Sequence, residues 1–191
     1  MTMIKSDIVL DAKGLACPMP IVRTKKTIKT LEPGQVIEVQ ATDKGSTADL
    51  RAWANSTGNH YLGTIEEGEV LRHYVRKSTG DVTEPAAFNQ TVDNAKVEAA
   101  RQDDSITVLD VREQAEYAFA HVPGAINIPL GELEARHTEL DSNQTIYVIC
   151  RTGSRSDMAC RQLSDKGYTV HNVVPGMQEW AFETTTLVSA K

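Results

Sequence analysis

The stretch Thr145-Ile-Tyr-Val-Ile-Cys150-Arg-Thr-Gly-Ser-Arg155-Ser156 joins an apolar run to a tight loop and then to the start of a helix. A short apolar run followed by turn residues is typical of a strand buried on both faces of a parallel sheet. Gly153 has no Cβ, so the backbone can turn sharply there. Cys150 is therefore predicted at the carboxyl end of a buried strand, where such sheets bind their ligands.

The loop after Cys150 has the features of an anion-binding cradle. Its backbone N–H groups are expected to point toward its centre, and the dipole of the following helix adds positive potential. Arg151 and Arg155 add two full charges. These surroundings favour a thiolate and an anion beside it, such as thiosulfate or the outer sulfur of a persulfide. The alternative, a cysteine that merely ends a core strand, leaves the arginines and Gly153 unexplained.

The same loop resembles the active-site loop of the rhodanese family, and other segments within residues 91–183 extend the resemblance. They are, in chain order, Leu109-Asp-Val-Arg112, Glu116-Tyr117, His121-Val-Pro-Gly-Ala-Ile-Asn-Ile-Pro129 and Gly176-Met-Gln-Glu-Trp180. Related phosphatases and arsenate reductases have a loop that is one residue longer. Here four residues separate Cys150 from Arg155, which favours sulfur over phosphate.

By this resemblance, Cys150 is the catalytic nucleophile of a sulfurtransferase. It would attack the outer sulfur of a donor such as thiosulfate, become a persulfide, and pass the sulfur to a thiol or to cyanide. Asp110 and Arg112 would support the loop, and Arg155 would hold both the loop and the anion. The substrate-binding residues are those of the loop itself: Arg151, Thr152, Gly153, Ser154, Arg155 and Ser156.

The rest of the second half alternates between strand and helix patterns, which indicates an α/β domain with a central parallel sheet and helices on both faces. Strands are predicted at residues 106–110, 126–128, 145–150 and 169–174. Helices are predicted at residues 93–101, 113–119, 133–140 and 154–166, with a last helical turn within 176–182. This rhodanese-like domain is placed at residues 92–191.

The first half has a different pattern, βαβαββ, which indicates a two-layer α+β sandwich of two helices on a small sheet. Strands are predicted at residues 8–10, 36–41, 60–65 and 70–76, and helices at 21–31 and 46–54. Ser46 is the predicted N-cap of the second helix. The domain is placed at residues 1–78, and the polar segment 79–91 is predicted to be a linker.

A second cysteine stands in the motif Cys17-Pro18-Met19-Pro20, between a predicted strand and a predicted helix. Proline suits the first positions of a helix, so the Cys17 thiol would lie at the positive end of the helix dipole, which favours thiolate. These residues alone agree equally well with a buried cysteine before a proline-started helix. Residues 14–20, however, are similar to the signature of TusA/SirA-like sulfur-carrier proteins. That resemblance implies that Cys17 carries a persulfide to or from a partner protein.

Because the chain carries two sulfur-handling resemblances, a relay in which Cys17 is a second persulfide carrier is one hypothesis. A short tether raises the effective concentration of one thiol near the other to the order of millimolar. Separate partner proteins for the two cysteines agree with the sequence equally well. The expected partners are a sulfane-sulfur donor, such as thiosulfate, and an acceptor thiol or partner sulfur-carrier protein.

The composition of the 191 residues excludes several classes of function. Hydrophobic residues make up 40% and charged residues 24%, which is ordinary for a folded globular protein. Residues 1–78 hold 11 basic and 9 acidic side chains, whereas residues 79–191 hold 9 and 17, so no nucleic-acid partner is expected. No stretch reaches the roughly 18 apolar residues of a membrane span, and no secretory signal starts the chain. We therefore expect a cytoplasmic protein with no membrane partner.

The cysteines and histidines do not form a pattern that binds metal, and no cofactor is expected. The 5 histidines are scattered, and the 3 cysteines include no Cys-x-x-Cys pair. Cys160 lies among apolar residues of a predicted helix and is interpreted as a small core residue. The other interpretation of Cys160 is a resolving thiol.

Two further functions remain open from the sequence. A binding module that regulates sulfur metabolism without turnover would need neither Cys150 nor the loop arginines. A thiol-redox protein would use Cys150 and Cys160 as a disulfide pair. A sulfurtransferase explains more of the motifs, and we take it as the prediction.

Overall fold

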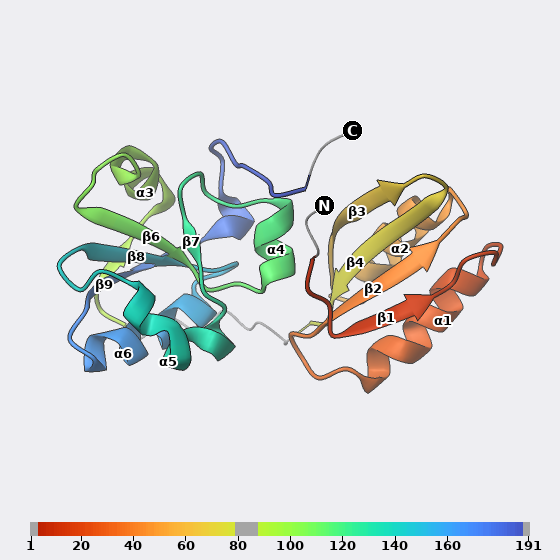
Figure 1. Ribbon diagram of the computed structural model, residues 1–191, viewed down its shortest axis with the longest axis horizontal. Helices are drawn as coiled ribbons and strands as arrows, with labels where there is room; N and C mark the ends of the chain where they lie inside the picture. Colours follow the sequence, from red (N-terminus) through yellow and green to blue (C-terminus); the bar gives the residue numbers. More distant parts are fainter. Residues whose placement is uncertain (1–3, 79–87, 189–191) are drawn as a thin grey trace. The chain divides into compact units, whose positions relative to one another are not determined.

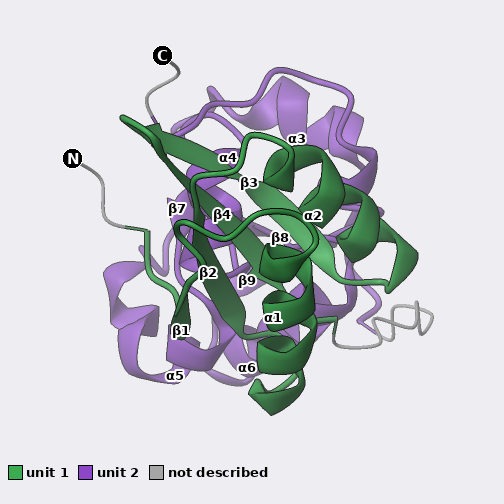
Figure 2. Cartoon of the chain, turned by 90° about the vertical axis from the view of Figure 1, so that its right-hand side faces the viewer, with its two compact units in different colours: residues 1–80, 190 green, residues 81–189, 191 purple. Residues whose placement is uncertain are grey.

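The computed structural model describes residues 4–78 and 88–188, which form two compact units (Figure 1). Figure 2 colours them separately, one within residues 1–80 and the other within residues 81–189. Residues 79–87 of the predicted linker lie outside the described residues. Thr91, which the sequence assigned to the linker, instead pairs with Asn172 in the sheet of the second unit.

The first unit is a four-stranded sheet with two helices on one face (Figure 1). The strand order is β1-β2-β4-β3, in which β1 and β2 are parallel and β4 is antiparallel to both of its neighbours. The elements are β1 (Ile8–Asp11), α1 (Met19–Thr27), β2 (Val36–Ala41), α2 (Ser46–Ser56), β3 (His60–Glu67) and β4 (Val70–Arg76). The predicted βαβαββ sandwich is confirmed.

The core of this unit follows from the two periodicities of its sequence. Ile37 and Val39 alternate along β2 and face the helices, while Leu50 and Trp53 lie one turn apart on α2 and are buried against them. This packing fixes the rotation of α2 about its axis. It therefore also fixes which residues of α2 face the loop that follows β1.

Ser46 does not have the role that the sequence predicted, because Gly45 is the N-cap of α2. The Ser46 hydroxyl lies inside the first turn, 2.5 Å from the carbonyl oxygen of Asp43 and 2.9 Å from Nε2 of His73. Nδ1 of His73 lies 2.8 Å from the Tyr61 hydroxyl and 3.0 Å from that of Thr64. His73 is fully buried, and burial lowers its pKa to about 4.

Stability of the first unit should therefore fall between pH 7 and pH 5. The pKa of His73 is below its ordinary value of about 6.5, so the neutral ring favours folding above pH 6.5 and this contribution is lost as pH falls toward 4. We expect a loss of roughly 1–2 kcal/mol in the free energy of unfolding, measured by urea denaturation followed by Trp53 fluorescence in a Trp180→Phe background. His73→Gln should flatten this pH dependence, and an unchanged slope would contradict the assignment.

The second unit is a five-stranded parallel sheet in the order β5-β9-β8-β6-β7 (Figure 1). Its strands are β5 (Thr91–Val92), β6 (Ile106–Asp110), β7 (Ile126–Asn127), β8 (Thr145–Ile149) and β9 (Thr169–Val173). Its helices are α3 (Asn94–Ala100), α4 (Gln114–Phe119), α5 (Leu133–Arg136) and α6 (Ser154–Asp165). The predicted α/β class with a central parallel sheet is confirmed.

Strand β8 is buried on both faces, as its continuous apolar sequence requires. Ile146 and Val148 join the core cluster that includes α5 and α6. Tyr147 and Ile149 join the other cluster, which includes α3. Cys150 follows β8 on the side of the first cluster, next to α6.

Several helices end earlier than the sequence pattern indicated, and the helix predicted at 21–31 is α1 followed by a 3₁₀ turn at Ile28–Thr30. The helix predicted at 133–140 is α5 followed by a 3₁₀ turn at His137–Glu139, and the final turn is confined to Met177–Glu179. Among the described residues, no helix has the length and apolar character needed to cross a membrane. The cytoplasmic location stays a prediction.

Candidate functional site

Cys150 lies immediately after β8 and is 1% exposed. The backbone N–H of Gly153 donates to its Sγ atom at 3.2 Å, and the Ser156 hydroxyl donates to it at 3.3 Å. Gly153 has a φ of 101°, in the left-handed region that favours glycine, and it is the residue before α6. Hydrogen-bond donors thus converge on the sulfur, which stabilises negative charge there.

A buried network behind the sulfur includes a residue that sequence reasoning missed. The Ser156 hydroxyl has one hydrogen and three acceptors within reach: Sγ of Cys150, the Gly153 carbonyl at 3.0 Å and Oδ1 of Asn172 at 2.6 Å. The Asn172 amide nitrogen in turn donates to the Gly153 carbonyl at 3.1 Å. Asn172 and Ser156 are fully buried. An asparagine within the otherwise apolar end of β9 was the signal that could have identified this partner.

A second loop approaches the Cys150 loop through backbone atoms. The N–H of Met177 donates to the Cys150 carbonyl at 2.9 Å, and that of Gln178 donates to the Arg151 carbonyl at 2.9 Å. Gly176 has a φ of 82°, and a Cβ atom there would lie 2.6 Å from the Cys150 carbonyl oxygen. The sequence resemblance included Gly176, and the structure supplies the reason for glycine.

Gly176→Ala should therefore displace the Cys150 loop and destabilise the second unit. The new methyl group meets backbone atoms that cannot turn away, and alanine is strained at this φ, so we expect a loss of roughly 2–4 kcal/mol. The measurement is urea denaturation followed by Trp180 fluorescence in a Trp53→Phe background.

Gly131→Ala is the matched control for this substitution. A Cβ atom at Gly131 would have open space around it. Its stability should change by no more than about 0.5 kcal/mol. Equal effects of the two substitutions would show that the close approach at Gly176 does not matter.

Arg155 is held by an ion pair with a carboxylate to which the sequence assigned no role. Its guanidinium donates to both carboxylate oxygens of Glu116 on α4, at 2.8 and 3.0 Å. The Glu116 side chain is 4% exposed, so the pair is well shielded from water. The pair ties the first turn of α6 to α4, which agrees with the loop-holding role predicted for Arg155. Glu116 belonged to a quoted motif, and its burial beside an arginine is what reveals its partner.

The other loop side chains are partly buried. Arg151, Thr152 and Ser154 each have intermediate exposure, and the Thr152 and Ser154 hydroxyls are 3.5 Å apart. Arg151 has no ion-pair partner among the residues that the structure describes. Its charge is therefore available to an anion at the loop.

Asp110 and Arg112 form a buried ion pair at the end of β6. The guanidinium donates to the carboxylate at 2.6 to 3.0 Å and to the Ala120 carbonyl at 2.7 Å. These bonds join the end of β6 to the end of α4. Asp110 pairs in register with Ile149, the residue before Cys150, and this is the route by which the pair would support the loop.

Cys17 is exposed and precedes α1, with Pro18 as the N-cap and Pro20 within the first turn. Its thiol donates to Oδ2 of Asp49 on α2 at 3.3 Å. The hydrogen bond to Asp49 raises the pKa of Cys17, and so do partial desolvation and the negative charges of Asp49 and Asp43. The expectation of a thiolate is therefore wrong. A full negative charge in contact with the sulfur outweighs the partial positive charge of a helix end.

Cys160 is fully buried in α6, and burial raises its pKa strongly. A thiol of this kind is seldom ionised, and disulfide exchange needs the thiolate. The packing interpretation of Cys160 is thus favoured over the resolving thiol.

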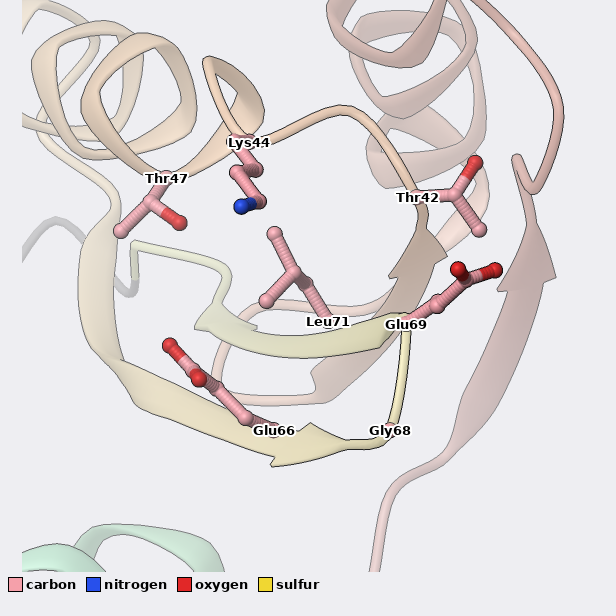
Figure 3. A pocket seen from close by; sticks show the side chains of 7 residues that line it. All are labelled: Thr42, Lys44, Thr47, Glu66, Gly68, Glu69 and Leu71. Carbon is pink, nitrogen blue, oxygen red and sulfur yellow. The ribbon is translucent and has the colours of Figure 1, made fainter. Parts of the chain in front are cut away.

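A hollow of about 640 Å³ opens between the β2–α2 loop and the β3–β4 hairpin of the first unit (Figure 3). Figure 3 shows Lys44 reaching over it from the loop, with Glu66 and Glu69 on the hairpin opposite. Its lining residues are Thr42, Lys44, Thr47, Glu66, Gly68, Glu69 and Leu71. Cys17 is not among them, so this hollow is not the site of the thiol.

Family models match both halves of the chain. The model described as "Sulfurtransferase TusA" matches residues 8–77, and that described as "Rhodanese-like domain" matches residues 93–183. These matches and the two thiol sites define the class as a two-domain sulfur-transfer protein. The chain belongs to the family that joins a TusA domain to a rhodanese-like domain, as its likeness over the full length of one curated relative shows.

That relative is "Putative sulfur carrier protein YrkF" of Bacillus subtilis (strain 168), which is 54% identical over 187 residues, 95% of this chain and 100% of the relative. "Sulfur carrier protein TusA" of Allochromatium vinosum is 47% identical over 38% of this chain and 95% of its own length. The crystal structure of a rhodanese-related protein from Thermoplasma volcanium, at 31% identity, covers 50% of this chain and 97% of its own with a TM-score of 0.48.

Proposed function

We propose that this protein is a sulfurtransferase that forms a persulfide on Cys150. The observation that carries the proposal is the pair of donors, Gly153 N–H and Ser156 O–H, that point at a cysteine between a strand end and a helix start. With thiosulfate as donor, the Cys150 thiolate attacks the outer sulfur. A bond forms between Sγ and that sulfur, the bond to the sulfite sulfur breaks, and sulfite leaves with the electron pair.

The loop would hold the donor and then the persulfide. The first backbone N–H groups of a helix have no partner within it, and α6 begins at Ser154, shortly after Cys150 in the same loop. Together with the Arg151 charge they favour the anionic donor and the anionic outer sulfur. An acceptor thiolate then attacks the outer sulfur, and Cys150 leaves as thiolate. Asp110 and Arg112 take no part in these steps except as support.

Cys17 would act as a second persulfide carrier. It is exposed on the TusA domain, so a thiol of another molecule can reach it. The support for this role is the TusA match over residues 8–77 and the names of the relatives as sulfur carriers. The acceptor is a thiol, either free or on a partner sulfur-carrier protein. Direct transfer from Cys150 is one route of loading, and a separate donor protein is the other.

Incubation of the reduced chain with thiosulfate should add one sulfur atom to Cys150. The adduct is detected by intact mass and located by peptide mapping. Cyanide should release the added sulfur as thiocyanate. Cys150→Ser should abolish both signals, because no nucleophile remains in the loop. Cys17→Ser should leave loading of Cys150 unchanged.

The control for a misfolded variant is the circular dichroism spectrum, which should not differ between wild type and Cys150→Ser. A wild-type chain that takes no sulfur from thiosulfate or from other sulfane-sulfur donors would refute the enzymatic proposal. Loading of Cys17 that requires Cys150 would support direct relay, whereas loading of Cys17 in Cys150→Ser would show that Cys17 takes sulfur without Cys150.

Ser156→Ala tests the role of the hydroxyl donor at Cys150. Removal of one hydrogen bond to a charged sulfur should slow persulfide formation by roughly tenfold, since such a bond is worth about 1.5 kcal/mol or more. The rate is measured by quenching the thiosulfate reaction at intervals and determining the mass of the Cys150 peptide by mass spectrometry. Ser164→Ala, a matched change at an exposed serine farther along the same helix, should react at nearly the wild-type rate. Equal rates for Ser156→Ala and wild type would show that the donor is unimportant.

A further inference from the structure

The two cysteines of the proposed sulfur chemistry have opposite surroundings. Donors from Gly153 and Ser156 point at Cys150 Sγ, whereas at Cys17 the sulfur itself is the donor and the Asp49 carboxylate accepts at 3.3 Å. Donors stabilise an anionic sulfur, and a carboxylate stabilises a neutral thiol and repels an anion. The Asp49–Cys17 contact therefore favours the uncharged form of the Cys17 sulfur. No step of the proposed function depends on this contact.

The position of Asp49 is rigid because it lies on α2, one residue before the buried Leu50. The Asp49 N–H donates to the Gly45 carbonyl at 3.2 Å, within the first turn. The backbone of Asp49 therefore cannot move away from Cys17 without rotation of the helix against the core. Its short side chain leaves the carboxylate within reach of the sulfur whether Cys17 is free or loaded.

The other charged groups around Cys17 do not cancel this carboxylate. From the β2–α2 loop, Asp43 adds a second negative charge. On α1, the Arg23 guanidinium lies 3.5 Å from the Asp11 carbonyl oxygen. Lys13, on the loop after β1, contacts the side chains of Gln40 and Asp11. The pKa of Cys17 is raised, which agrees with a net negative environment.

We propose that the Asp49 carboxylate biases Cys17 toward its unloaded thiol form, so that at equilibrium Cys17 holds sulfane sulfur more weakly than it would without this charge. This inference rests on the proposed role of Cys17 as a persulfide carrier. It adds a direction to that role, because Asp49 acts as a positioning residue that shifts the equilibrium toward unloading.

The chemistry of unloading shows why the carboxylate matters. An acceptor thiolate attacks the outer sulfur of the Cys17 persulfide, a new S–S bond forms, and the bond to Cys17 Sγ breaks with its electron pair on Sγ. The resulting thiolate takes a proton from water and becomes the thiol that donates to Asp49. No oxidant or reductant is consumed. A hydropersulfide is a stronger acid than its parent thiol, so near neutral pH the loaded form is the anion that Asp49 repels.

This bias has a pH signature that a purely structural role lacks. Near neutral pH the unloaded form is a neutral thiol and the loaded form is an anion, so the carboxylate distinguishes between them. Above the pKa of the Cys17 thiol both forms are anions, and the distinction shrinks. The effect of removing the Asp49 charge should therefore be largest near neutral pH and disappear at alkaline pH.

The test uses the full chain with Cys150→Ser, so that only Cys17 exchanges sulfur. It compares Asp49 with Asp49→Asn and Asp49→Glu, and uses Glu69→Gln as a control that removes a carboxylate from the hairpin shown in Figure 3. One arm measures the pH dependence of Cys17 alkylation by iodoacetamide. In the other arm, each protein is equilibrated with glutathione and glutathione persulfide. The ratio of loaded to unloaded Cys17 peptide is then measured by mass spectrometry. Circular dichroism checks that each variant is folded.

Asp49→Asn should lower the pKa of Cys17 and raise the ratio of loaded to unloaded Cys17 by roughly three- to tenfold at neutral pH. Asp49→Glu and Glu69→Gln should stay near the parent protein in both arms. An unchanged ratio in Asp49→Asn, with Cys17 still taking sulfur, would overturn this inference and leave the carrier role intact. Failure of Cys17 to take sulfur in any variant would overturn both.

Discussion

The burial of β8 on both faces is the constraint on which the second unit depends. A strand in the middle of a parallel sheet needs apolar side chains in both directions, and Ile146 to Ile149 supply them without a break. The neighbouring strands and the helices on the two faces of the sheet bury these side chains. The strand ends just before Cys150, so the sulfur is placed at the end of a strand that is buried on both faces. The loop that follows needs only to bend its N–H groups and one hydroxyl toward an atom whose position is already fixed.

The first unit presents its cysteine by a different principle. Cys17 is exposed, and its position is set by a loop between β1 and α1 and not by a buried strand. Its closest charged neighbour comes from α2, whose rotation is fixed by Leu50 and Trp53 in the core. One unit therefore offers an enclosed sulfur with donors around it, and the other offers an accessible sulfur beside a carboxylate. This contrast fits the proposed division of labour between a catalytic thiol at Cys150 and a carrier thiol at Cys17.

Much of this arrangement could be predicted from the sequence because it depends on local patterns. The run from Thr145 to Cys150 and the Gly153 turn specify the strand and loop, and periodicity predicts the order of the main elements in both units, although it missed the short strand β5. Contacts between residues far apart in the chain could not be read in the same way. Asn172 behind Cys150, Glu116 on Arg155 and Asp49 on Cys17 all depend on how helices and strands pack. The thiolate expected for Cys17 was wrong for that reason, since the helix dipole is local and the carboxylate that overrides it comes from another helix.

The Ser156 hydroxyl has a consequence for the speed with which the site can respond. It can turn its single hydrogen from the Asn172 amide to the Cys150 sulfur by rotation about one bond, while every heavy atom keeps its place. A change in the charge of the sulfur is then met by the reorientation of one small dipole. Within this network, the change of charge therefore requires no shift of a backbone atom.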